Sequence, residues 1–362
     1  MKKSNTTKSV MVLLAALVSV HAWAQITAPR ALSPAAKVSQ TIGISTVTVK
    51  YSRPSVKGRE VWGKLVPYGW NVQPGYGAQN SAPWRAGANE NTTIEFSHPA
   101  KVGGQLVPAG VYGLFFVINQ DNSGEVILSK DNRAWGSFWY TPTQDQLRAK
   151  IALRDAAHTE LLTYDFINLT KNSADLVLNW EKKQFPVNIE FAVDEIVIAN
   201  ASEELKSTTG FTPNGFSSAA NYALQNNIGL DKALGWIDQA IQLNPSFTNL
   251  SIKSGVLKKA GKTAEADQLM KDALVKANEA EINQYGYQLL NLGQNDRAIE
   301  ILTINTQRFP KSANAFDSLG EAYALKGDKE NAIKNFKKSL AMDPPAATKA
   351  NSEKYLQQLG SK

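Results

Sequence analysis

The sequence contains no cysteine and few histidines. Without cysteine it can form no disulfide, thiolate zinc site or iron–sulfur cluster, and it has no cysteine nucleophile or cysteine-linked lipid. Of the three histidines, only His98 and His158 follow residue 24, and neither lies in an H-E-x-x-H motif or a cluster with metal spacing. We therefore expect no metal site and no cofactor. The G-x-S-x-G and G-x-x-x-x-G-K motifs are absent as well.

The N-terminal apolar run is too short to cross a bilayer. Val10 to Val20 gives about 11 apolar or small residues, whereas a membrane-spanning helix needs about 20. Three lysines precede this run, and the small residues Ala22 and Ala24 follow it at the spacing of a secretory cleavage site. We predict that residues 1–24 are a signal peptide cleaved after Ala24. The protein would then be secreted or periplasmic, with no membrane span.

A strong excess of positive charge is also missing once this segment is removed. The formal charge is +7, from 39 basic and 32 acidic residues. Removing the three lysines of residues 1–24 lowers 39 to 36 and the net charge to +4. No lysine-rich tail remains, so the sequence does not favour binding of nucleic acid through its phosphates.

Residues 25–195 have the pattern of β-strands. Apolar Val47, Val49 and Tyr51 alternate with polar residues, and this period of two recurs in four later segments before residue 194. Turn pairs such as Gly103-Gly104 separate such segments. Eight or nine short strands without helical periods between them predict an antiparallel β-sandwich or barrel.

After residue 195 the apolar period becomes helical. We predict a linker at 196–213 and a helical array at 214–362. Gly286 and Gly320 are 34 residues apart, as are matching alanines and prolines, which is the period of tetratricopeptide repeats. The positions of the repeat's packing residues are occupied by Phe316, Leu319, Gly320, Tyr323, Ala332, Phe336 and Pro344. This half therefore resembles a tetratricopeptide array of about four repeats, ending in a capping helix at Thr348–Leu359.

The resemblance to tetratricopeptide repeats implies a concave groove lined by the first helix of each pair. The positions that would line it are Tyr222, Gln225, Ser251, Lys258, Asn283, Tyr287, Asp317 and Glu321. We expect this groove to bind a protein or peptide partner. The alternative is that the repeats brace the β domain or mediate self-association.

The β domain carries a second candidate site in its irregular segments. Between residues 51 and 90, glycine and proline interrupt the strands, and arginines and tryptophans accumulate. The residues predicted to bind a ligand are Arg53, Lys57, Arg59, Trp84, Arg85 and Asn89. Flat indoles and forked guanidinium donors suit a glycan, a sugar ring or a carboxylate. The alternative is that these tryptophans fill the core and these arginines fix loops.

Four phrases of this half carry a resemblance to a known family. They are SPAAKVSQTIGISTVTVKYSRPSVKGREVWG, WRAGANE, GGQLVPAGVYGLFFVI and WGSFWY. Together they resemble the secreted family catalogued as domain of unknown function 2911. The resemblance covers roughly residues 26–194 and implies a β-rich exported domain of Bacteroidetes-type bacteria, sometimes followed by tetratricopeptide repeats. It implies no reaction.

An enzymatic function is the alternative to binding. Glycoside hydrolysis needs two carboxyl groups about 5 to 10 Å apart, and Glu90 with Glu60 or Glu95 lies near the tryptophan-rich segments. A serine triad using one of the two histidines also stays open. For Glu90, an ion pair with Arg85 is the simpler interpretation. The sequence thus favours an envelope binding or scaffold protein over a glycan hydrolase.

Overall fold

The computed structural model describes residues 32–72, 77 and 79–360. The predicted signal peptide lies outside these residues. The chain divides into two compact units between Phe191 and Ala192, and each unit is described by itself. None of the described helices is both long enough and apolar enough to cross a bilayer.

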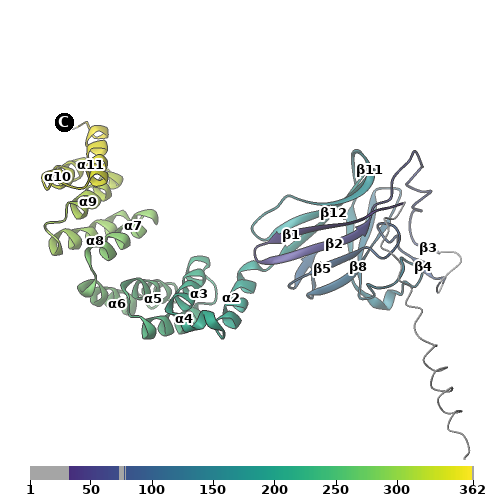
Figure 1. The fold of residues 1–362 in the computed structure, drawn as a ribbon, viewed down its shortest axis with the longest axis horizontal. Coiled ribbons are helices and arrows are strands. Elements are labelled where there is room, and N and C mark those ends of the chain that lie inside the picture. The colour runs from purple at the N-terminus through teal and green to yellow at the C-terminus, as the bar shows by residue number, and fades with distance from the viewer. Residues whose placement is uncertain (1–31, 73–76, 78, 361–362) are drawn as a thin grey trace, which may run out of the picture. The chain divides into compact units, whose positions relative to one another are not determined.

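The first unit consists of antiparallel β-sheets (Figure 1). Its larger sheet has six strands in the order β1-β2-β5-β8-β9-β10, and a second sheet has four in the order β11-β12-β6-β7. A third sheet pairs β3 with β4. The strands are β1 (Ala35–Ile42), β2 (Ser45–Ser52), β3 (Asn71–Val72), β4 (Ser81–Ala82), β5 (Thr93–Phe96), β6 (Ala100–Val102), β7 (Gln105–Val107), β8 (Gly110–Ile118), β9 (Ser123–Ser129), β10 (Asp145–Ala152), β11 (Arg154–Ile167) and β12 (Ser173–Phe191).

The alternation of apolar and polar residues explains the burial within these strands. Val47 and Val49 of β2 are fully buried, whereas Lys50 between Val49 and Tyr51 is exposed. β8 is buried continuously from Tyr112 to Ile118, because Phe115 and Val117 pack in a cluster with Tyr140 while Phe116, on the other face, contacts the ring of Phe185 of β12. Gly103-Gly104 forms the predicted hairpin turn between β6 and β7, and both residues have the positive φ that this turn requires. The predicted antiparallel β fold of this half is confirmed.

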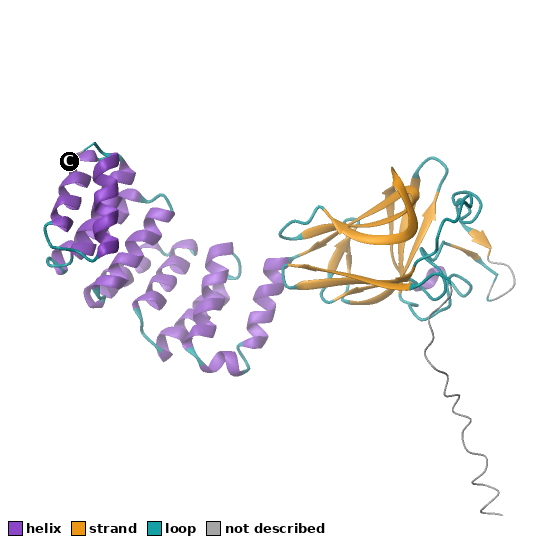
Figure 2. Cartoon of the chain, turned by 45° about the horizontal axis from the view of Figure 1, so that its top comes forward, coloured by secondary structure: helices purple, strands orange, loops and turns teal. Residues whose placement is uncertain are grey.

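The second unit consists of helices that follow one another as antiparallel neighbours (Figure 2). A short 3₁₀ turn at Thr208–Phe211 joins the first two. The helices are α2 (Val193–Glu204), α3 (Pro213–Asn226), α4 (Leu230–Leu243), α5 (Phe247–Lys259), α6 (Thr263–Lys276), α7 (Glu279–Asn291), α8 (Asn295–Arg308), α9 (Ala313–Lys326), α10 (Lys329–Leu340) and α11 (Ala346–Gln358). From α3 to α10 they make four pairs, and α11 is the expected last helix.

The segment predicted as a linker differs from this expectation. α2 (Val193–Glu204) extends into the predicted linker 196–213, and the remainder of that segment holds the 3₁₀ turn and Pro213, the first residue of α3. The helix has no side-chain N-cap, and within it only Val193 and Ile198 are buried. Because only these two apolar side chains pack against the rest of the protein, the segment, which is rich in serine and glutamate, has a sequence typical of a linker.

Small residues allow the paired helices to approach closely. Ala233, Ala266, Ala298 and Ala332 occupy equivalent positions in successive second helices, and all four are fully buried. At Gly320 of α9, a β carbon would lie 2.9 Å from the Phe336 ring of α10. The close approach of the paired helices thus explains why small residues recur in each pair, and the predicted tetratricopeptide-like array is confirmed.

Candidate functional site

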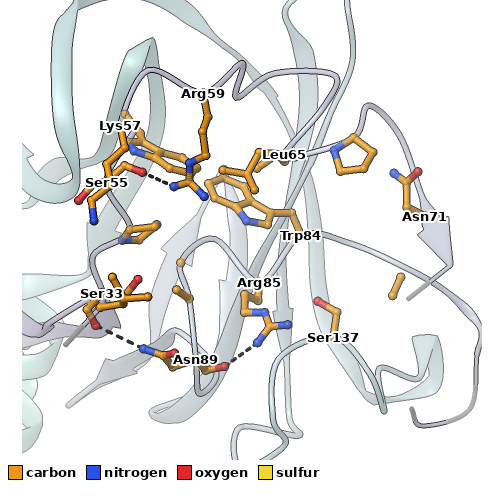
Figure 3. Close-up of a pocket in the computed structure, with 18 of the residues that line it drawn as sticks. Ser33, Ser55, Lys57, Arg59, Leu65, Asn71, Trp84, Arg85, Asn89 and Ser137 are labelled. Carbon is orange, nitrogen blue, oxygen red and sulfur yellow. Dashed lines mark hydrogen bonds between the residues drawn. The ribbon is translucent and has the colours of Figure 1, made fainter. Parts of the chain in front are cut away.

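A pocket of about 550 Å³ opens among the irregular segments of the β unit (Figure 3). This volume lies within the range of small-molecule sites. Five of the six predicted ligand-binding residues line it, namely Lys57, Arg59, Trp84, Arg85 and Asn89. The RPSVKGR and WRAGANE phrases, which are separated by more than twenty residues, therefore meet at one place.

The two phrases reach the pocket because each is bonded to a different sheet. Val56 of the first phrase donates its backbone N–H to the Glu160 carbonyl of β11 at 2.9 Å. Trp84 of the second exchanges two backbone hydrogen bonds with Phe116 of β8, at 2.8 and 2.9 Å. The pocket thus lies between a segment held by the four-stranded sheet and one held by the six-stranded sheet.

Arg59 and Lys57 supply positive charge on the first wall. Arg59 donates through Nε to the Val56 carbonyl at 3.0 Å and through Nη2 to the Ser55 carbonyl, as Figure 3 shows for Ser55. The Lys57 backbone N–H donates to Glu160 Oε1 at 2.9 Å, and this bond lowers the pKa of the Glu160 carboxyl. Both residues are exposed, and the positive charge of Arg59 also contributes to the lowered pKa of the Glu160 carboxyl.

Arg85 and Asn89 supply the second wall from a tight turn. Arg85 Nη1 donates to the Asn89 carbonyl at 2.6 Å, and Asn89 Nδ2 donates to the Ser33 carbonyl at 3.3 Å (Figure 3). The Arg85 guanidinium also lies 5.4 Å from the centre of the Phe138 ring. Burial lowers the pKa of Arg85, because desolvation penalises its charge. A bound anion would offset this penalty.

Two non-glycine residues of this turn adopt left-handed backbone angles. They are Ala86 at φ 54° and Asn89 at φ 61°. Asparagine tolerates this conformation, whereas for alanine it costs about 1 to 2 kcal/mol. The Ala86 carbonyl accepts hydrogen bonds from Tyr164 Oη at 2.9 Å and Thr92 Oγ1 at 3.1 Å. These two bonds hold the turn that carries Arg85 and Asn89.

An aromatic cluster forms part of the pocket wall. The Trp84 and Trp180 rings stack with centroids 5.9 Å apart and planes 15° apart, and Trp62 meets both edge-on. Trp180 is buried, and its Nε1 has no hydrogen-bond partner among the described residues. In the view of Figure 3, Trp84 appears between Arg59 and Arg85. The site therefore combines indole surface with positive charge.

Among the described residues, the lining contains three cationic side chains and no carboxylate. A positively charged lining of this kind suits an anion, and the planar guanidinium groups suit a carboxylate. The sequence did not single out the lining residues Ser33, Asn71, Ser137 and Trp180 as ligand contacts. Ser137 lies within the WGSFWY phrase, which was the available signal. Among the described residues, no group of three histidine or acidic side chains gathers as a metal centre would require.

Arg53 does not line the pocket, which corrects its predicted role. Its Nε donates to the Leu162 carbonyl at 2.9 Å and its Nη2 to Thr163 Oγ1 at 2.5 Å. Both partners belong to β11. The guanidinium therefore fixes the segment after β2 to the second sheet, as the structural alternative for these arginines supposed.

The glutamates of the hydrolase alternative also lie away from the pocket lining. Glu60, Glu90 and Glu95 are exposed, and none of them lines it. Glu95 of β5 lies 3.9 Å from the Lys50 ammonium of β2. The structure brings no pair of these carboxylates into the pocket and gives the hydrolase alternative no support.

The predicted partner residues lie on the first helices of the four pairs, α3, α5, α7 and α9. Several already bond to neighbouring helices. Tyr222 donates to Asp194 of α2 at 2.7 Å, and Tyr287 donates to Glu321 of α9 at 2.9 Å. Lys258 forms an ion pair with Asp267 at 2.9 Å. Ser251 Oγ donates within its own helix, whereas Gln225 is exposed and Asn283 is half-buried with an unpartnered Oδ1 among the described residues.

Asp317 is buried, with 4% exposure, and does not face an open groove. Asn351 Nδ2 of α11 donates to its carboxylate at 2.9 Å, and Ser352 Oγ of the same helix also donates to it. Burial raises the pKa of Asp317, and the nearby Glu321 raises it further. The predicted groove position therefore fastens the last helix to the array.

Comparisons with known proteins agree with this division. Residues 33–189 match the model of the family described as "Protein of unknown function (DUF2911)", and residues 313–345 match the tetratricopeptide repeat. Both resemblances drawn from the sequence are confirmed. The cellulose synthase operon protein C of Escherichia coli K12 is 36% identical over 70 residues, which is 19% of this chain and 6% of that protein. The chain therefore spans only a small part of this curated relative.

Solved structures match the helical half at low identity. The protein YrrB, titled a TPR protein with an unusual peptide-binding site, is 20% identical, with 44% of this chain and 84% of that chain covered and a TM-score of 0.27. The structure of MamA is 19% identical and covers 42% of this chain and 89% of the MamA chain, with a TM-score of 0.27. The structure of PilF of Pseudomonas aeruginosa is 18% identical and covers 42% of this chain and 71% of the PilF chain, with a TM-score of 0.27.

Proposed function

We propose that this protein is an exported binding protein whose β unit takes up a carboxylate-bearing ligand of the acidic-sugar type, while its helical repeats hold a protein or peptide partner. The observation that carries the first part is that Lys57, Arg59 and Arg85 line one pocket whose described residues include no carboxylate. The Trp84 ring beside them offers a flat surface for a sugar ring.

The charge of Arg85 supports an acidic sugar over a neutral one, and the Trp180 indole offers a donor to either. Arg85 is partly desolvated, so a carboxylate near it would gain a strong charge-assisted hydrogen bond. The Trp180 Nε1 donor is buried without a partner among the described residues, and an unsatisfied buried donor costs about 1 to 3 kcal/mol. A ligand oxygen, or a water molecule held by the ligand, would satisfy it.

Calorimetric titration of the full chain with galacturonate, beside neutral galactose, tests the ligand. We expect galacturonate to bind and galactose to bind at least about tenfold more weakly, the factor that corresponds to one charge-assisted contact. Lys57→Gln and Arg59→Gln should each weaken galacturonate by about the same factor. Lys150→Gln on β10, an exposed lysine outside the pocket, is the matched control and should have no effect. Equal binding of both sugars would contradict the proposal.

The partner function of the helices rests on the tetratricopeptide match and the four helix pairs. Gln225, Ser251 and Asn283 are the predicted groove positions whose side chains form no hydrogen bond with a neighbouring helix among the described residues. We expect the replacement of all three by arginine to abolish capture of a partner that the unmodified protein retrieves. Lys271→Glu and Glu300→Arg, exposed changes on the second helices α6 and α8, should retain that partner. If the control variants lost the partner while the triple arginine variant retained it, the groove assignment would be contradicted.

Export is a further part of the proposal and rests on the sequence of residues 1–24 alone. N-terminal sequencing of the protein recovered from cell fractions tests it. The expected result is a mature chain that starts at Gln25 in the envelope or medium fraction. An intact Met1 in the cytoplasmic fraction would contradict it.

A further inference from the structure

Two large exposed aromatic side chains flank, in sequence, a residue that lines the pocket. Trp135 and Trp139 are each 49% exposed, although most tryptophans of the β unit are buried or half-buried. Ser137, midway between them, lines the pocket. Because two residues of chain span at most about 7 Å, both indoles are attached within that reach of the pocket wall.

The loop that carries these indoles is anchored at three neighbouring points. Ser137 Oγ donates to the Pro83 carbonyl at 2.6 Å, and the Phe138 ring lies 5.4 Å from the Arg85 guanidinium. Tyr140 is buried, and its hydroxyl donates to Asp145 Oδ2 at 2.7 Å. The two exposed indoles are therefore presented from a fixed segment and not from a free loop.

We infer that Trp135 and Trp139 form a second subsite that stacks on further sugar rings of an acidic oligosaccharide whose first carboxylate lies in the pocket. The inference rests on the proposed function of the pocket and names its ligand class. Indoles offer large flat contact surfaces with only two side-chain torsions to fix, so an anchored tryptophan binds a ring at low entropic cost.

The charges of the site select among oligosaccharides. Lys57, Arg59 and Arg85 line the pocket, and no carboxylate is among its described lining residues, so a neutral chain would not offset the desolvation of the half-buried Arg85 charge. The exposed indoles add apolar contact but no charge. The ligand is therefore a chain of sugars that carries acidic groups, held more tightly than one acidic sugar.

Titration of the full chain with galacturonate, trigalacturonate and neutral maltotriose tests this. We expect trigalacturonate to bind about tenfold more tightly than galacturonate, as two stacking contacts would give, and maltotriose to bind more weakly than either acid. The double variant Trp135→Ala, Trp139→Ala should lose that gain and leave galacturonate affinity unchanged. Phe211→Ala, which removes an 80% exposed aromatic residue of the helical unit, is the control and should change neither.

The outcomes separate this inference from the function on which it rests. If galacturonate fails to bind, both are overturned. If galacturonate binds but trigalacturonate gains nothing, or if the double variant weakens both acids equally, the second subsite alone is overturned. A double variant that keeps the chain-length gain but loses binding to phosphatidylglycerol–phosphatidylcholine vesicles would assign the indoles to a lipid surface and overturn it as well. Far-UV circular dichroism of each variant checks that the fold is retained.

Discussion

Gly136 packs directly against the guanidinium of Arg85. A β carbon built on Gly136 would overlap the Arg85 Cζ and Nη1 atoms, and the φ of Gly136 is 62°. The guanidinium therefore occupies the space that any other residue at position 136 would fill. This contact joins the WGSFWY phrase to the WRAGANE phrase, and it makes Gly136 a positioning residue for one cation of the pocket.

Gly136→Ala should therefore displace Arg85 and weaken galacturonate binding by about tenfold, the value of one charge-assisted contact. It should also lower the free energy of unfolding by more than the roughly 1 to 2 kcal/mol expected for left-handed strain alone. Gly104 in the β6–β7 turn has φ 82°, and a β carbon there would meet no atom within 4 Å. Gly104→Ala should therefore lower the free energy of unfolding through backbone strain but leave galacturonate affinity unchanged. Calorimetry and urea denaturation measure the two effects. Equal behaviour of the variants would contradict the role of Gly136.

Two glycines of the helical unit differ in the space around them, and replacing each by alanine should change the free energy of unfolding in opposite directions. A β carbon on Gly286 would lie 2.5 Å from Leu302 Cδ2, whereas one on Gly235 would meet nothing within 4 Å. Gly286→Ala should therefore lower the free energy of unfolding by about 1 to 3 kcal/mol through overpacking. Gly235→Ala should raise it by about 0.5 to 1 kcal/mol, since alanine is the better helix former. Urea denaturation followed by circular dichroism at 222 nm measures both, and a stabilised Gly286→Ala variant would refute the packing account.

Asp317 predicts a pH dependence of the helical unit. Burial raises the pKa of Asp317 in the folded state above its unfolded value, so its protonated form favours folding. This contribution to stability is fully present below the unfolded pKa and is lost as the pH rises through the folded pKa. Asp317→Asn should remove the effect, so the unfolding free energy of the variant relative to the unmodified protein should increase from pH 4 to pH 7.

Urea denaturation across that pH range measures the difference for Asp317. Asp272→Asn on α6 is the control, because Asp272 is exposed and accepts a hydrogen bond from Gln268 one turn away on the same helix. Parallel profiles for the unmodified protein and Asp317→Asn would contradict the assignment of the pH effect to Asp317.

The local patterns predicted the fold well, because period and packing are local properties. Val47 and Val49 face inward as their alternation required, and Gly320 approaches Phe336 as the 34-residue period implied. Local patterns could not predict which arginines line the pocket and which bond to a neighbouring strand. Arg53 and Arg59 lie six residues apart in one phrase, but Arg53 meets β11 through residues more than 100 positions away, whereas Arg59 lines the pocket.

The meeting of the two phrases at the pocket was also beyond the sequence. The RPSVKGR phrase is attached to β11 and WRAGANE to β8, so their proximity depends on how two sheets pack. The same holds for Trp180, whose position on β12 brings it to the pocket. The residue types indicated the chemistry of the site, but which residues line the pocket depends on contacts between strands that are far apart in the sequence.

The most direct test of the central claim is a crystal structure of the full chain grown with galacturonate. The proposed function predicts the sugar in the pocket, with its carboxylate within hydrogen-bond distance of Lys57, Arg59 or Arg85 and its ring against Trp84. An empty pocket at a galacturonate concentration that saturates the protein in solution, or a sugar bound elsewhere, would contradict it.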